Sequence, residues 1–144
     1  MAKTNKLPAD LKQECLWIVR GYERRKRDYR LRREEILNST PDGNGNGGQP
    51  GNPVERAAIH LLKLENHPEV LRMRAVENAL KIIGADIKND KLRDKLRDAV
   101  YKNCLSGRKY PYERLDVDGV SRMGFYRQKT AFLLEIAEML GYIA

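Results

Sequence analysis

The chain has 144 residues, and 28 Lys and Arg against 20 Asp and Glu give it a net charge of +8. No apolar run approaches the ~18 residues that span a bilayer. Residues 1–10 also lack the apolar stretch of a signal peptide. We therefore expect a cytoplasmic protein without a membrane partner. Cys15 and Cys104 lie too far apart in sequence for a disulfide scaffold, so both are expected to be reduced and buried.

Residues 1–38 are predicted to form one long charged helix, from about Pro8 to Leu37. Positions spaced alternately by four and three residues form a heptad seam that is mostly apolar: Leu11, Cys15, Ile18, Tyr22, Arg25, Tyr29, Arg32 and Ile36. An apolar seam of this kind needs a partner helix, because most helical stability comes from packing an apolar face. We therefore expect a helical hairpin, a second copy of the chain, or both to cover it.

Two features of this helix bear on function. Arg25 and Arg32 interrupt the seam, so its second half is expected to be weaker or to bind an acidic group. Three aromatic residues recur at helical spacing, and hairpin packing is a better explanation for them than base stacking. They are Trp17, Tyr22 and Tyr29.

Residues 39–53 are predicted to be a linker, because they are rich in Gly, Asn and Pro and show no periodicity. Such a composition buries too little apolar surface to offset the entropy lost on ordering. After the linker, residues 54–84 resume a helical pattern that Pro68 interrupts. These return helices would pack against the first helix as an antiparallel hairpin.

Residues 85–144 are predicted to form a helix-turn-helix bundle. Asn89 and Asp90 are suited to begin one helix, and residues 111–115 are predicted to form a second, short one. A turn containing Gly119 follows, and Ser121 is suited to cap a final helix that runs to about Leu140. A short helix, a turn and a capped helix are the parts of a helix-turn-helix. Because no strand pattern appears, the predicted fold class is all-α.

Basic residues are concentrated in two places, which favours a polyanionic partner such as nucleic acid. The first cluster spans residues 24–33, where a solvated helix face explains the charge equally well. The second spans residues 108–129, and its members within the final helix, Arg122, Arg127 and Lys129, lie in the first half of that helix. That polarity opposes the helix dipole, which favours acids first and bases last. Phosphates around a helix that enters a DNA groove would compensate for it.

The candidate DNA-binding residues lie before the final helix and on its first turns. They are Arg108, Lys109, Tyr112, Ser121, Arg122, Met123, Tyr126, Arg127, Lys129 and Thr130. Arginine is the commonest side-chain partner of guanine, through its bidentate fork. For Tyr110 and Tyr112, core packing and phosphate contact explain the sequence equally well. Phe125 is expected to face the core.

The string Val120-Ser-Arg-Met-Gly-Phe-Tyr-Arg127, followed by Ala137-Glu-Met-Leu-Gly-Tyr142, resembles phage late transcription activators of the RinA and ArpU type. The resemblance implies a helix-turn-helix like region 4 of sigma factors. It also implies a sequence-specific, phage- or prophage-encoded activator that binds double-stranded DNA near a promoter and contacts RNA polymerase. The hairpin would then serve homodimerisation or polymerase contact. Leu115 and Asp118 depart from the Ala and Leu usual in the first helix, so that helix is expected to be shortened or rebuilt.

Other functions find less support in the sequence. No catalytic motif or dinucleotide fingerprint is present, so we expect neither an enzyme nor a cofactor. Cys15, Cys104, His60 and His67 lack the spacing of metal ligands, and no metal is expected. The main alternative is a DNA-packaging protein resembling a small terminase subunit, which forms a ring of about eight or more copies. A helical interaction protein without a DNA role is a third hypothesis.

Overall fold

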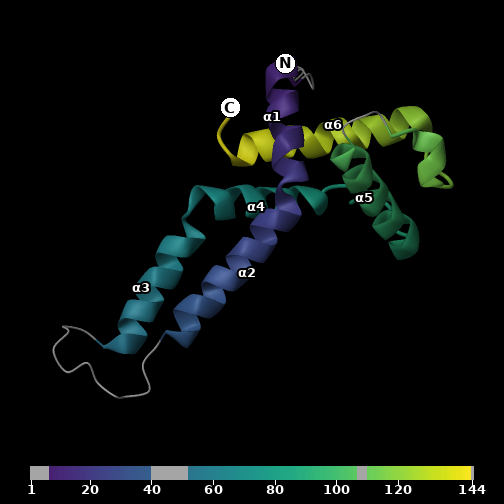
Figure 1. The fold of residues 1–144 in the computed structure, drawn as a ribbon. Helices are drawn as coiled ribbons and strands as arrows, with labels where there is room; N and C mark the ends of the chain where they lie inside the picture. The colour runs from purple at the N-terminus through teal and green to yellow at the C-terminus, as the bar shows by residue number, and fades with distance from the viewer. Residues whose placement is uncertain (1–6, 40–51, 107–109, 144) are drawn as a thin grey trace.

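The computed structural model describes residues 7–39, 52–106 and 110–143. Over these ranges the chain is helical and contains no strand, which confirms the all-α prediction (Figure 1). The elements are α1 (Ala9–Arg20), α2 (Tyr22–Asn38), α3 (Pro53–Glu65), α4 (Pro68–Leu80), α5 (Asp90–Leu105), the 3-10 helix η1 (Tyr112–Leu115) and α6 (Arg122–Met139). None of the described helices is both long enough and apolar enough to cross a bilayer. Most of the predicted linker, and also Arg108 and Lys109, lies outside the described residues.

Four helices begin where a side chain accepts a hydrogen bond from a backbone N–H of the first turn. These N-caps are Asn52, His67, Asn89 and Ser121. The predicted starts at Asn89 and Ser121 are therefore confirmed. In α3 and α4 a proline follows the cap. A backbone N–H at this position has no acceptor within the helix, so the proline costs no helical hydrogen bond.

The predicted single helix of residues 8–37 is divided at Gly21 into α1 and α2, which point in different directions (Figure 1). The Arg25 side chain folds back across the helix at this glycine. Its Nη1 donates to the Ile18 carbonyl at 2.8 Å. A Cβ on Gly21 would lie 2.4 Å from the same nitrogen, so a larger residue would displace the guanidinium. The division thus coincides with a side-chain contact that helical periodicity does not predict.

Arg25 also forms an ion pair with Glu69 of α4, and only 11% of the Arg25 side chain is exposed. The acidic group expected where Arg25 interrupts the seam therefore comes from the same chain. The hydrogen bond from Arg25 lowers the pKa of Glu69 below its ordinary value of 4.5, although partial burial acts in the opposite direction. Arg32, the other interruption, pairs with Glu35 on its own helix and remains exposed.

Arg25→Met is expected to lower the free energy of unfolding at neutral pH by about 1–2 kcal/mol, since it removes two hydrogen bonds of a charged donor. Because the folded-state pKa of Glu69 is lowered, the contribution of the ion pair is complete above pH 4.5 and is lost as the pH falls below it. Urea unfolding of both proteins between pH 7 and pH 3 measures this difference.

The matched control is Arg32→Met, because Arg32 pairs with Glu35 on the exposed face of the same helix. Such surface pairs contribute little, so the control should remain within about 0.5 kcal/mol of wild type. A penalty for Arg25→Met that stays constant down to pH 3 would contradict the assignment to Glu69.

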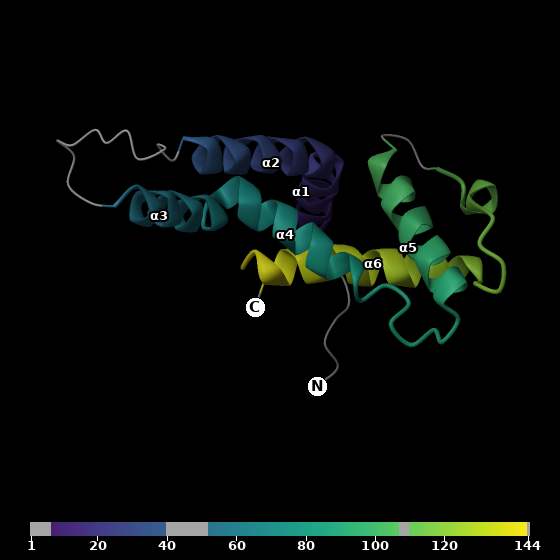
Figure 2. The ribbon, with the colours of Figure 1, turned by 90° about the horizontal axis from the view of Figure 1, so that it is seen from below.

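The four helices α1, α4, α5 and α6 enclose the main core, whereas α2 and α3 lie side by side and extend from it as an arm (Figures 1 and 2). α6 crosses both α1 and α4 and contributes Phe125, Phe132 and Ile136, which are fully buried. Cys15 and Cys104 are free and buried as predicted, and burial raises the pKa of each thiol to about 11.

The aromatic residues of the first two helices do not all pack as predicted. Tyr22 is buried and donates a hydrogen bond to Glu77 at 2.8 Å, and Tyr29 is half-buried and bonded to Glu65. The prediction for Trp17 is wrong, because 65% of its surface is exposed. α1 turns Cys15, Leu16, Ile18 and Val19 toward the core, which leaves Trp17 on the opposite face.

Candidate nucleic-acid interface

The turn before α6 is fixed by Tyr112 of η1. The Tyr112 hydroxyl donates to the carbonyls of Val117 and Val120, and its ring packs against Phe125 with centroids 5.1 Å apart. Tyr112 therefore serves core packing, one of the two roles that the sequence left open. The short helix predicted at residues 111–115 is observed as η1, which has four residues. Gly119 has a φ of +83°, a conformation that side chains with a Cβ rarely adopt.

α6 presents one face to the core and one to solvent. Phe125 is fully buried, as predicted, and Gln128 accepts a hydrogen bond from the Gly84 N–H in the α4–α5 connection. Five predicted residues lie on the outer face, four of them exposed and Tyr126 half-buried: Arg122, Met123, Tyr126, Arg127 and Thr130. The core contacts thus hold the first turns of α6 in place while their polar face remains accessible.

A basic groove lies between α1, α5 and the first half of α6, with a volume of about 360 Å³. Its lining residues are Lys12, Asn103, Arg122, Tyr126, Lys129, Thr130 and Leu133. We call these residues the α6 groove. Burial raises the pKa of the nearby Cys104 thiol, whereas the positive charges of Lys129, Arg20 and Lys12 lower it. Cations of α1 and α6 therefore lie close enough to this thiol, beside the α6 groove, to lower its pKa.

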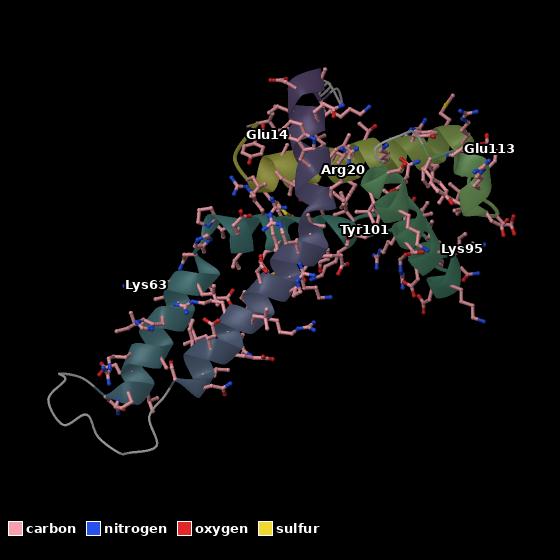
Figure 3. The ribbon with its side chains drawn as sticks, viewed as in Figure 1. Glu14, Arg20, Lys63, Lys95, Tyr101 and Glu113 are labelled. Carbon is pink, nitrogen blue, oxygen red and sulfur yellow. The ribbon has the colours of Figure 1, made fainter. Side chains whose placement is uncertain are left out.

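Arg20 fixes the position of α5 against α1, and so one wall of the α6 groove. Its guanidinium donates to the carbonyls of Cys104 and Ser106, both at 3.2 Å, at the end of α5 (Figure 3). Carbonyls in the last turn of a helix lack intrahelical partners, and a cation there is favourable. The contact joins residues 84 positions apart in the sequence.

Asn103 is a buried polar residue of the α6 groove. Its Nδ2 donates to the Tyr110 carbonyl at 2.7 Å, whereas its Oδ1 has no hydrogen-bond partner among the described residues. A buried amide oxygen needs a donor, which water or a bound N–H or O–H group could supply. The groove therefore combines cations with a buried amide oxygen that has no partner among the described residues.

The cations of the outer face are weakly held. Arg122 forms an ion pair with Glu113 at 3.4 Å, but 69% and 62% of the two side chains are exposed. Such a pair contributes little to stability and exchanges readily for another anion. The Arg127 side chain has no hydrogen bond or ion pair within the described chain. Both guanidinium groups can therefore turn to an external phosphate or base edge.

The structure brings most of the sequence-predicted site residues together. Arg122, Tyr126, Lys129 and Thr130 line the α6 groove, Met123 and Arg127 lie on the adjoining exposed face, and Ser121 caps the helix. Lys12 and Asn103 were missed by sequence reasoning. No periodicity could reveal them, because their place in the groove depends on how α1 and α5 pack against α6.

The other basic cluster, on α2, is partly neutralised. Lys26, Arg30 and Arg33 line a concavity of about 440 Å³ between α2 and α4, but Glu34 and Glu77 share it. Arg24, Arg25 and Arg32 have acidic partners. By contrast, the residues that line the α6 groove in the described part of the chain include cations and no acid. The α6 groove is thus the stronger candidate for a polyanion.

The fold and the site define an all-α protein with a basic groove beside the first turns of its last helix. No family model, curated protein or solved structure matches the chain. The function is therefore proposed from these residues and their geometry.

Proposed function

We propose that the protein binds double-stranded DNA sequence-specifically and activates transcription near a promoter. The observation that supports this most is the polarity of α6: its first turn has no acid and its last turn no base. The exposed Arg122 and Arg127 lie near its start, while Glu135 and Glu138 lie near its end. This order is unfavourable for an isolated helix dipole, and it is favourable for a helix whose start is surrounded by phosphates.

The proposed binding mode places the first turns of α6 in the major groove, which is wide enough to admit an α-helix. Arg122, Met123, Tyr126 and Arg127 would face base edges. Lys12 and Lys129 in the α6 groove would contact the phosphate backbone, which positions the protein without reading sequence. The transcriptional role and the RNA polymerase contact rest on the resemblance to phage late activators.

Selection of bound duplexes from a random DNA library tests the proposal, followed by affinity measurement for the selected sequence and a scrambled one. Arg122→Ala and Arg127→Ala should each weaken specific binding by about 1–3 kcal/mol and relax the sequence preference at one position. Binding to the scrambled duplex should change less, because base contacts distinguish sequences whereas phosphate contacts do not.

Arg72→Ala is the matched control, since Arg72 lies on α4 and pairs with Glu69 there. It should leave the affinity and the selected sequence unchanged. If the Arg122 and Arg127 variants fold normally and keep full affinity and selectivity, α6 is a structural helix and the proposal is wrong.

A further inference from the structure

α3 differs from the other α-helices in how it is packed. Seven of its 13 residues are apolar, but none of them is buried. Each of the other five α-helices has buried residues. A helix with this composition gains little stability from the contacts that the described chain supplies, since burial of apolar surface is the main favourable contribution.

The exposed apolar residues of α3 lie along one side of the helix. Val54, Ala58 and Leu62 follow one another at four-residue steps, and Ile59 lies beside them. The exposed fractions of Val54, Leu62 and Ile59 are 66%, 64% and 48%. The half-buried apolar residues of α3, Ala57, Leu61 and Leu64, adjoin this face on one side, since Leu61 follows Val54 by two helical turns. Contiguous exposed apolar residues of this kind mark interaction surfaces.

The charges beside this face are arranged to match a second copy of the same face. Glu55 lies near the start of α3 and Lys63 near its end, as Figure 3 shows for the outward-pointing Lys63. Neither side chain has an ion-pair partner in the described part of the chain. An antiparallel copy would bring Glu55 next to Lys63 of the partner subunit, whereas a parallel copy would oppose like charges.

We propose that two copies of this chain associate through α3, antiparallel and centred on Ala58 and Ile59. Val54 then packs against Leu62 of the partner subunit, and the small side chain of Ala58 allows the helices to approach closely. A two-fold interface of this kind uses the same patch twice and so closes on itself. It differs from a dimer formed through the heptad seam of α2, because α2 packs against α3 and α4 of its own chain.

The shape of the chain permits this association. The arm formed by α2 and α3 projects from one end of the body, whereas α5 and the start of α6 lie at the opposite end (Figure 2). A second copy on α3 would therefore leave both α6 grooves accessible. One consequence rests on the proposed function: a dimer would bind two inverted half-sites on DNA. The association itself does not depend on DNA binding.

The test is the mass of the full chain in solution, measured by sedimentation equilibrium at about 1–100 µM without DNA. We expect twice the monomer mass of 16.6 kDa. Val54→Asp and Leu62→Asp should each raise the dimer Kd at least about tenfold. Leu71→Asp is the matched control, because Leu71 is 46% exposed and lies on α4, and it should remain dimeric. Circular dichroism checks that all variants are folded.

Cross-linking tests the register of the helices. Ala58→Cys should form an intersubunit disulfide on oxidation, because the position faces itself, whereas Val54→Cys should not. The two native thiols are fully buried and should not contribute. A monomer throughout the concentration range, a dimer insensitive to both aspartate substitutions, or a mass of about eight or more chains would overturn the proposal.

Discussion

Phe125→Ala is expected to lower the free energy of unfolding by roughly 3–5 kcal/mol, as truncation of a fully buried aromatic residue does. Phe125 has no exposed surface and contacts the rings of Tyr112 and Tyr126, with centroids 5.1 and 5.3 Å away. Its removal would leave a cavity where η1, the turn and α6 meet. Because whole domains are stable by only about 5–15 kcal/mol, this single change removes a large share of the total.

Urea unfolding followed by circular dichroism measures this effect. Met123→Ala serves as the control, because it truncates a side chain that is 72% exposed only two positions away. The control should stay within about 0.5 kcal/mol of wild type. A loss below about 1 kcal/mol for Phe125→Ala would mean that α6 does not dock through this residue, and the placement of the α6 groove would have to be revised.

DNA affinity is expected to fall about 10-fold between roughly 50 and 200 mM salt, because Lys12 and Lys129 of the α6 groove would contact two phosphates. Each neutralised phosphate releases condensed counterions and adds about −0.9 to the slope of log affinity against log salt. Two contacts therefore give a slope of about −1.8. Fluorescence anisotropy of a labelled duplex across a salt series measures it.

Lys12→Ala is the decisive variant, because Lys12 belongs to α1 and joins the groove only through the tertiary structure. It should weaken all duplexes alike and reduce the magnitude of the slope by about one unit. Arg30→Ala on α2 gives the comparison, since Arg30 lines the other basic concavity. If Arg30→Ala flattens the slope and Lys12→Ala does not, DNA lies along α2 instead. An affinity independent of salt would falsify nucleic-acid binding altogether.

The sequence by itself determined the local structure. Helical periodicity and the absence of alternating strand patterns predicted the all-α fold, and the caps at Asn89 and Ser121 are where side-chain chemistry placed them. The apolar positions of the seam also became core, as Cys15 and Ile18 show. These features depend on residues within one or two turns of each other, so the sequence alone carries the necessary information.

The tertiary structure decided which faces meet. Spacing alone could not show whether Trp17 faces a partner helix or solvent. It also could not show that the first helix is divided at Gly21. Lys12 enters the α6 groove only because α1, α5 and α6 pack together, and Arg20 links α1 to the end of α5 across 84 positions. Periodicity shows that a helix has an apolar face, but the partner of that face depends on contacts between segments distant in sequence.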